Sequence, residues 1–483
     1  MAALNRFPLI YEVNTRVWLR ELSLKAGRAL TLADIPEAEF CKWRELKVDI
    51  VWLMGVWEES AAARQIAQTH QGLWQEYQRA LPDVELSDVG ASPFAVKSYS
   101  VAQALGGESA LFKFRHRLNE KGMRLLLDFV PNHMARDCKW LNVHPDYFVA
   151  VPPHMVKHLS DGVVQHNGTY FACGKDPYFP AWTDTVQLNY ANSALHVAMQ
   201  ETLRQIAKLC DGVRCDMAML ILKDVFNRTW GEFGLEMKEE FWKKTIDDLK
   251  SQFPNFLFIA EAYWDLEWTL QQQGFNFVYD KRLYDRLRDQ DVSGVKAHLY
   301  GDVLYQQKLI RFIENHDEAR AAATFGANHR VAALITHTAI GAHLLHEGEH
   351  EGRRLKVPVQ LLRRAAEEPD TELADFYHRL SHVWNNAAVT NGDFRMLEGY
   401  SSHNIIAFER QSGGHTGHIL VFANLTAYPQ ESYYPSLALS HVQDYEHIEV
   451  FVTDARKSPQ FELWLGGFSV RLRPHEGLVF VVR

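Results

Sequence analysis

Apolar residues along the chain gather in short runs that end at Gly, Pro, Asn or Asp. Eight of these segments are candidates for buried strands. They span residues 8–18, 49–57, 123–133, 211–219, 256–264, 275–281, 309–318 and 338–349. Between several of them the apolar positions recur three and four residues apart, as on one face of a helix, for example over 110–122 and 193–210. Strands that alternate with helices predict a parallel sheet.

The number of alternating units favours a closed barrel. Eight units of strand and helix suit a (β/α)8 barrel with inserted loops. The alternative is an open doubly wound sheet. No G-x-G-x-x-G segment follows the first run, however, so the dinucleotide-binding signature of that fold is missing. We therefore predict an α/β fold of the TIM-barrel type.

The pattern changes at two places, which predicts two further domains. A long connection separates the third strand from its helix, and connections of this length are usually functional. Near the C-terminus, short alternating runs with Gly-rich turns replace the helices. We predict a barrel formed by residues 1–133 and 192–389, an inserted domain after strand 3 at 134–191, and a C-terminal all-β sandwich at 390–483.

The predicted insert is rich in aromatic residues. They are Trp140, Tyr147, Phe148, Tyr170, Phe171, Tyr178, Phe179 and Trp182. Aromatic side chains serve either as local core or as platforms for sugar rings. We expect most of them to pack locally and a minority to contact ligand.

Composition and charge narrow the class of partner. The formal net charge of −9 provides no basic field for nucleic acid or an anionic membrane, so a neutral or cationic ligand is expected. No apolar run reaches the length of a membrane span, and the first residues lack the apolar core of a signal peptide. The five cysteines lack C-x-x-C spacing, which favours a reducing compartment. We expect a cytoplasmic protein.

One short segment resembles a metalloprotease motif. Residues 346–350 read H-E-x-x-H, which binds zinc when both histidines project from one face of a helix. Here Gly348 lies within the motif and Gly352 follows it, and glycine is a poor helix former. We expect the end of a strand and a loop here instead of a zinc site. Glu347 or Glu349 is then expected to face the substrate at the end of the barrel where the strands terminate. Zinc bound in stoichiometric amount would favour the protease alternative.

Polar residues end four of the eight strands. In a (β/α)8 barrel, catalytic groups lie at the C-terminal ends of the strands, so these residues should converge on one rim. They are Asp128, Asn132, His133, Arg214, Asp216, Glu261, His316 and Asp317. Cleavage of a glycosidic bond with retention requires an ionised carboxylate as nucleophile and a protonated carboxyl as acid, and a third carboxylate can stabilise the transition state.

The neighbours of two carboxylates suggest their roles. Arg214 lies two positions before Asp216 and therefore on the same side of the strand, where it can keep that carboxylate ionised. Glu261 precedes Ala, Tyr and Trp, and apolar surroundings raise the pKa of a carboxyl that serves as the acid. Cys215 alternates to the opposite side and is expected to pack in the core.

Four segments together resemble the α-amylase family of glycoside hydrolases. They are LLLDFVPNH, DGVRCDMAM, FIAEAYW and FIENHD, which occur in the order of that family's four motifs. The resemblance covers essentially the whole chain, because the family has a domain inserted after the third strand and a C-terminal β-sandwich. By motif position it implies that Asp216 is the nucleophile, Glu261 the general acid/base and Asp317 the transition-state stabiliser.

The resemblance also implies a sugar-binding subsite. Arg214, His133 and His316 would line it, with Asp128 supporting Arg214. In the region where the family places an aromatic residue under the sugar ring, Phe94 is the candidate, and the histidine often found close by is absent.

Two positions depart from the family pattern. Met219 and Leu220 stand where members that favour long starch chains often have Lys-His, so the acceptor side must be built differently. Gln187 stands where the family's structural calcium site often has an Asp. We therefore expect no required cofactor and no metal site, with structural Ca²⁺ as the alternative.

The expected function is hydrolysis of α-glucosidic bonds in maltooligosaccharides or related α-glucans by double displacement. The alternative is a glucan transferase, because the same carboxylates serve transfer to another sugar. A third alternative is an inert sugar-binding protein with this fold, which an intact set of three carboxylates disfavours.

Overall fold

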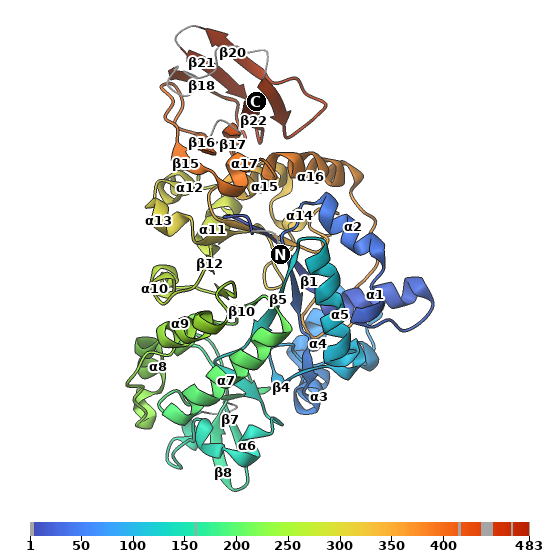
Figure 1. The fold of residues 1–483 in the computed structure, drawn as a ribbon, viewed down its shortest axis with the longest axis vertical. Coiled ribbons are helices and arrows are strands. Elements are labelled where there is room, and N and C mark those ends of the chain that lie inside the picture. Colours follow the sequence, from blue (N-terminus) through green and yellow to red (C-terminus); the bar gives the residue numbers. More distant parts are fainter. Residues whose placement is uncertain (1–3, 160–161, 414–416, 436–447, 465–466, 483) are drawn as a thin grey trace.

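The computed structural model describes residues 4–159, 162–413, 417–435, 448–464 and 467–482. Its centre is a closed barrel of parallel strands (Figure 1). The strands are β1 Leu9–Asn14, β2 Ile50–Met54, β5 Arg124–Phe129, β10 Gly212–Cys215, β11 Leu257–Ala260, β12 Phe277–Tyr279, β13 Leu309–Arg311 and β14 Ala342–His346. Each of the eight lies within a predicted run, so the predicted (β/α)8 barrel is confirmed.

The barrel strands pair in the order of the chain, and β14 closes the ring against β1. In that register Glu12 of β1 lies beside His346 of β14 and Trp52 of β2. Parallel strands that are covered on both faces read as continuous apolar runs. Accordingly, every residue of β2 is buried.

Helices surround the barrel, and one short helix at residues 140–143 lies instead in the long connection that follows β5 (Figure 1). They are α1 Thr15–Ala26, α2 Glu37–Glu45, α3 Ala61–Thr69, α4 Gln71–Ala80, α5 Gly107–Glu120, α6 Trp140–Val143, α7 Ser193–Leu209, α8 Lys223–Trp230, α9 Trp242–Gln252, α10 Glu267–Gln272, α11 Lys281–Arg288, α12 Val292–Leu299, α13 Val303–Gln306, α14 Ala321–Thr324, α15 His329–Thr338, α16 Thr371–Trp384 and α17 Ala387–Asn391. The helix predicted over 193–210 is α7. It begins at Ser193 because the Asn192 side chain caps it by accepting a hydrogen bond from the Ala194 amide.

The long connection between β5 and α7 forms small antiparallel sheets. Here β6 His133–Ala135 pairs with β9 Thr185–Gln187, and β7 Val163–His166 pairs with β8 Thr169–Ala172. The β7–β8 hairpin lies at one end of the molecule, opposite the C-terminal strands (Figure 1). Another pair, β3 Trp57–Glu59 with β4 Val96–Val101, lies in the connection after β2.

The C-terminal part consists of two antiparallel sheets with an apolar core between them. The strands are β15 Asp393–Met396, β16 Ile405–Gln411, β17 His418–Asn424, β18 Gln430–Pro435, β19 Ile448–Val452, β20 Gln460–Trp464, β21 Gly467–Leu472 and β22 Gly477–Val482. This arrangement confirms the predicted all-β domain. β16 and β17 form the predicted hairpin, whose turn residues 414–416 lie outside the described residues.

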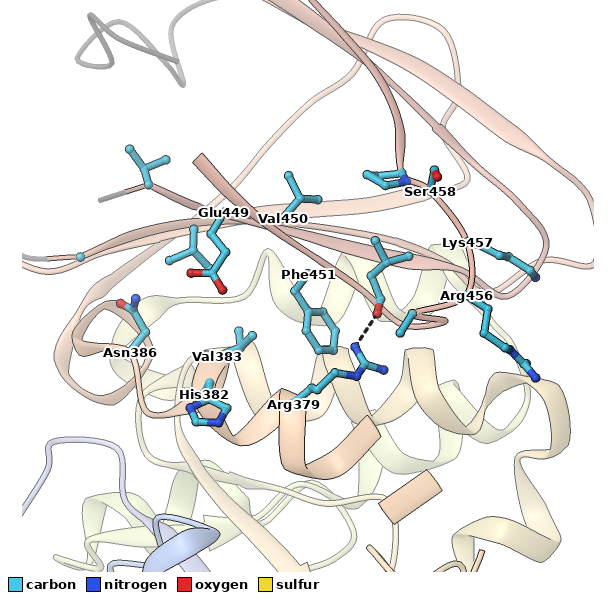
Figure 2. A pocket seen from close by; sticks show the side chains of 16 residues that line it. Arg379, His382, Val383, Asn386, Glu449, Val450, Phe451, Arg456, Lys457 and Ser458 are labelled. Carbon is cyan, nitrogen blue, oxygen red and sulfur yellow. Dashed lines mark hydrogen bonds between the residues drawn. The ribbon is translucent and has the colours of Figure 1, made fainter. Parts of the chain in front are cut away.

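A cavity of about 1050 Å³ separates α16 from the C-terminal sheet (Figure 2). Arg379 of α16 spans part of it and donates a hydrogen bond to the Val452 carbonyl at 3.1 Å. Arg456 and Lys457 also line this cavity, and Glu449 is its one acidic lining residue among the described residues. A site for glycosidic cleavage needs a carboxylate pair, so the catalytic centre must lie elsewhere.

Candidate functional site

A second cavity, of about 540 Å³, opens at the C-terminal ends of the barrel strands. Five of the predicted site residues line it: Phe94, His133, Asp216, Glu261 and Asp317. The other three, Asp128, Arg214 and His316, are buried and do not line it. Arg214 and His316 nevertheless contact carboxylates that line the cavity, and Asp128 contacts Arg214.

The Arg214 guanidinium connects two of the carboxylates. Its Nη1 lies 2.6 Å from Asp216 Oδ1, and its Nη2 lies 2.8 Å from Glu261 Oε2. Because β10 and β11 are neighbours in the barrel, side chains at their ends reach the same cation. Burial disfavours its charge, but Glu261 and the other anions hold the pKa of Arg214 above its usual value. Arg214 therefore stays cationic and fixes both carboxylates.

Glu261 is a buried carboxyl with two further hydrogen bonds. The Met217 amide donates to Oε2 at 2.6 Å, and the Tyr263 hydroxyl donates to Oε1 at 2.8 Å. Met217 adopts a left-handed backbone conformation (φ 41°), which is rare outside glycine and typical of functional sites. Burial raises the pKa of Glu261 to about 7, and Asp216 and Asp317 reinforce the rise against Arg214. The carboxyl is suited to donate a proton near neutral pH.

Asp317 is paired with a cationic histidine. His316 Nε2 lies 3.0 Å from Asp317 Oδ2, while Nδ1 lies 2.5 Å from Glu12 Oε1. Although burial disfavours the imidazolium, Asp317 and Glu12 raise the pKa of His316 to about 10. In return, against the effect of burial, His316 and Arg214 hold the pKa of Asp317 below its usual range. Asp317 is thus a fixed anion at the cavity.

Aromatic rings enclose the two buried cations. The Phe94 ring stacks on His316 with centroids 5.2 Å apart, and the Arg214 guanidinium carbon lies 5.1 Å from the Phe94 centroid. Trp52 and Tyr279 also face the guanidinium, at 5.3 and 5.7 Å. Cation–π contacts of this kind strengthen in a desolvated site. Phe94 lines the cavity and also contacts both buried cations, so it lies between them and the cavity.

Asp128 is buried beneath the residues that line the cavity. Its Oδ1 is 3.9 Å from Arg214 Nη1, and it accepts closer hydrogen bonds from Trp52 Nε1 at 3.1 Å and the Gly55 amide at 3.2 Å. Burial raises the pKa of Asp128 to about 6, which Arg214 partly offsets. Its closest contacts are thus with Trp52 and the Gly55 amide, and its ion pair with Arg214 is longer.

Residues of the predicted insert form part of the cavity wall. Of its eight aromatic residues, Phe179 and Trp182 line the cavity, and Trp182 packs against His133 at 5.1 Å between ring centroids. Burial lowers the pKa of His133, so this imidazole is neutral. Tyr178 is exposed and contacts Trp264 edge to face.

The H-E-x-x-H segment is a strand end and turn, as predicted. His346 ends β14, and Gly348 and Gly352 have positive φ angles. The prediction for the two glutamates is wrong, because neither lines the cavity. Glu347 accepts a hydrogen bond from the Asn14 amide, and Glu349 accepts one from the Tyr377 hydroxyl at 2.7 Å, so the start of the turn is tied into the barrel.

The place of the family's structural calcium is filled by an amide. Gln187 Nε2 donates to the Asn132 carbonyl at 2.9 Å, to Asn132 Oδ1 at 3.0 Å and to the Leu188 carbonyl at 3.1 Å. These three oxygens have the chemistry of calcium ligands, but a nitrogen donor already serves them. The residues therefore do not fit a cation at this position.

Several residues of the site escaped prediction. Glu12 interrupts a fully buried strand, and this buried charge is a signal that sequence reasoning could have used. Gln360 and Asp176 line the cavity from irregular connections, where no periodic pattern marks them.

Within the described residues, no group of three or more His, Cys, Asp or Glu side chains is arranged to hold a metal ion. Among the helices of the same residues, none is both long enough and apolar enough to cross a bilayer.

Two curated proteins match parts of the chain. Alpha-amylase MalA of Haloarcula japonica is 24% identical over 265 residues, which cover 53% of this chain and 36% of that protein. The alpha-glucosidase of Culex pipiens is 22% identical over 299 residues, which cover 52% of this chain and 51% of that protein. The chain thus spans about half or less of the length of these relatives.

Solved structures share the whole fold. The noncanonic maltogenic alpha-amylase AmyB of Thermotoga neapolitana superimposes with a TM-score of 0.69 at 18% identity, covering 99% of both chains. An alpha-amylase of Lactobacillus plantarum gives 0.64 at 18% identity, again covering 99% of both chains. A family model of the alpha-amylase catalytic domain matches residues 94–388, more than half of the sequence, including the strands that carry Asp216, Glu261 and Asp317. The chain therefore belongs to the alpha-amylase family.

Proposed function

We propose that the protein hydrolyses α-glucosidic bonds in maltooligosaccharides or related α-glucans, with retention at the anomeric carbon. The observation that carries the proposal is that one guanidinium contacts both Asp216 and Glu261 at a cavity that Asp317 also lines. Contact with a common cation keeps the first two carboxylates close, as double displacement requires at roughly 5 Å. The names of the two curated relatives, an alpha-amylase and an alpha-glucosidase, agree with this substrate class.

Asp216 is the proposed nucleophile. Its ion pair with Arg214 holds one carboxylate oxygen in place, and its position on the cavity wall makes it accessible to a bound sugar. Attack by one carboxylate oxygen on the anomeric carbon displaces the leaving-group oxygen and forms a glycosyl ester.

Glu261 is the proposed general acid and then base. In the first step the protonated carboxyl gives its proton to the departing oxygen. In the second step the carboxylate takes a proton from water, which attacks the anomeric carbon and releases Asp216. A pKa of about 7 serves both directions near neutral pH.

Asp317 is proposed to stabilise the positive charge that develops on the sugar ring. Its ionisation is secured by His316, which Glu12 holds in place. Each step is thus assigned to a side chain of this chain, and we propose that no cofactor takes part.

Hydrolysis is preferred to glucosyl transfer because the site is open to water. The Asp317 side chain is 46% exposed, so the cavity is open to solvent where Asp317 lines it. Transfer to a second sugar would require that the acceptor exclude this water.

The function is tested by incubating the protein with maltooligosaccharides, trehalose, sucrose and isomaltose and following the products by anomeric NMR. We expect shorter α-glucans with the α anomer formed first. Products longer than the substrate would favour the transferase, and an initial β anomer would contradict double displacement. An Asp216→Asn variant should fold and bind sugar without turnover, whereas a wild-type chain that binds without turnover would be a sugar-binding protein.

A further inference from the structure

A segment of irregular backbone crosses one side of the barrel at the end where the cavity opens. Residues 353–364, here called the strap, follow β14 and run to the connection after β2. The strap pairs with residues 88–90 there. The Gly90 amide donates to the Gln360 carbonyl at 2.8 Å, the Leu362 amide donates to the Asp88 carbonyl at 2.8 Å, and an antiparallel bridge joins Val89 to Leu361.

Side-chain contacts also hold the strap in place. Leu361 is fully buried in a small apolar cluster with Val89. Arg363 Nε lies 2.8 Å from Asp88 Oδ1, and Arg16 donates to the Val359 carbonyl at 2.7 Å. These contacts come from two separate parts of the chain, α1 and residues 88–90, and Gln360 of the strap lines the cavity, so the strap forms part of its wall.

The strap packs closely against its partner segment at Gly90. A Cβ atom added to Gly90 would lie 2.9 Å from a Leu362 methyl carbon and 2.6 Å from Glu59 Oε1. Glycine at this position therefore permits the Leu362 and Glu59 side chains to pack closely against residues 88–90.

The strand order shows which side of the sugar is walled. Around the barrel, β13, β14, β1 and β2 are consecutive, and the strap bridges this half. Glu261 follows β11 on the other half, beside β10 and β5 with the insert. Because the acid must reach the departing oxygen, the leaving group lies on the Glu261 half. The nucleophile Asp216 also follows β10 on the Glu261 half, whereas Asp317 follows β13 on the walled half and lines the cavity together with Gln360 of the strap. The ring of the transferred sugar, whose charge Asp317 is proposed to stabilise, and anything attached to its non-reducing end therefore extend toward the walled half.

We infer that the strap closes the cavity behind a single sugar unit, so that the enzyme removes one glucosyl residue at a time from the non-reducing end. The inference rests on the proposed function and specifies its substrate as a free chain end. Gln360 supports it, because this strap residue lines the cavity together with Asp317 and offers an amide to hydroxyl groups of a terminal sugar. Long chains that must pass through the site at an internal bond would collide with the strap.

The test compares two p-nitrophenyl α-maltoheptaosides, one free and one with an ethylidene group across O4 and O6 of its non-reducing sugar. Early products are separated by chromatography. We expect glucose as the first product of the free compound and no cleavage of the blocked one. Cleavage of the blocked compound, or maltose and longer products released first from the free one, would overturn the inference and leave the proposed function intact. If neither compound nor p-nitrophenyl α-glucoside is cleaved, the function itself fails and the inference with it.

A variant checks the role of the strap side chain. Gln360→Ala should lower kcat/KM for p-nitrophenyl α-glucoside about tenfold, because a site built to bond a hydroxyl loses its partner. Its circular dichroism spectrum and melting temperature should match those of the wild type. Gln205→Ala, at an exposed position of α7, is the matched control and should leave kcat/KM unchanged. Equal kcat/KM in both variants would exclude Gln360 from substrate recognition.

Discussion

Protonation of Glu261 sets the expected upper pH limit of activity. The acid must carry its proton when the leaving group departs, and burial raises the pKa of Glu261 to about 7. On this alkaline limb we expect kcat/KM to level off about one pH unit below 7 and to fall about tenfold per pH unit well above pH 7. A pH profile with p-nitrophenyl α-glucoside measures this limb.

The Tyr263→Phe variant tests whether Glu261 controls the alkaline limb of that pH profile. The Tyr263 hydroxyl donates a hydrogen bond to Glu261 Oε1, and a bond to the carboxylate favours its ionised form. Removing the hydroxyl should move the alkaline limb to higher pH. A limb that stays in place, or moves to lower pH, would show that another group controls it.

The Glu12 and His316 pair is expected to stabilise the fold at neutral pH. Glu12 is fully buried, so Glu12→Gln leaves the buried imidazolium with one anionic partner fewer. We expect the free energy of unfolding at pH 7 to drop by about 3 kcal/mol, measured by urea titration. Glu76→Gln, at an exposed position of α4, is the control and should have little effect.

The difference in unfolding free energy between wild type and Glu12→Gln should depend on pH, because the fold raises the pKa of His316. The pKa of His316 is raised to about 10 in the fold, from about 6.5 in an unfolded chain. The charged pair therefore contributes fully below pH 6.5, and its contribution is lost as the pH rises through 10. The gap between wild type and Glu12→Gln should narrow toward pH 10, and a gap independent of pH would contradict the assignment.

At the scale of elements, periodic segments were predictable and irregular ones were not. The eight barrel strands follow from apolar runs, and Asp216, Glu261 and Asp317 follow from their positions at strand ends. The strap has no repeating pattern, and its contacts to 88–90 are made largely by backbone groups, whose partners the sequence does not encode in residue type. The orientation of Glu347 and Glu349 was missed for a similar reason, because the tight turn directs Glu347 toward the end of β1 and Glu349 toward α16.

The pairing of β6 with β9 leads to a prediction about calcium. Since the Gln187 amide already serves the oxygens of Asn132 and Leu188, we expect EDTA to leave the melting temperature of the wild type unchanged. Gln187→Asp removes that donor and adds a charge. The variant should lose about 2 kcal/mol of stability and regain part of it in millimolar Ca²⁺. Differential scanning fluorimetry measures both effects.

Gln205→Asp, on the exposed surface of α7, is the control for this substitution and should gain nothing from Ca²⁺. A wild-type chain whose melting temperature falls in EDTA would contradict the account of the amide.

At the scale of the whole molecule, the barrel and the C-terminal domain share one core. Apolar residues of β16, β17 and β22 belong to the same buried cluster as the barrel strands, including Phe408, Val421 and Val479. The composition change near residue 390 indicated a separate all-β domain, and the two sheets confirm its architecture. The shared core could not be predicted, because alternation along a strand does not reveal what covers its buried face.

Arg410 of β16 makes this junction a test of cooperativity. Its guanidinium is fully buried and donates to four carbonyls that belong to barrel and linker segments. They are those of Thr338, Ala339, Val389 and Gly392, at 2.8 to 3.0 Å. We expect one calorimetric transition for the wild type. Arg410→Ala leaves the four carbonyls without their donor, so it should cost about 4 kcal/mol and lower the melting temperature by several degrees.

Arg456→Ala is the matched control for the junction, because Arg456 also crosses it. Arg456 Nη1 pairs with Glu372 Oε1 at 3.0 Å, but both side chains are more than half exposed, and solvent screens such a pair. Its melting temperature should equal that of the wild type. Two separate transitions in the wild type, or equal effects of the two variants, would show that the C-terminal domain folds independently of the barrel. A single transition that only Arg410→Ala weakens would show that the two domains stabilise each other through their buried contacts.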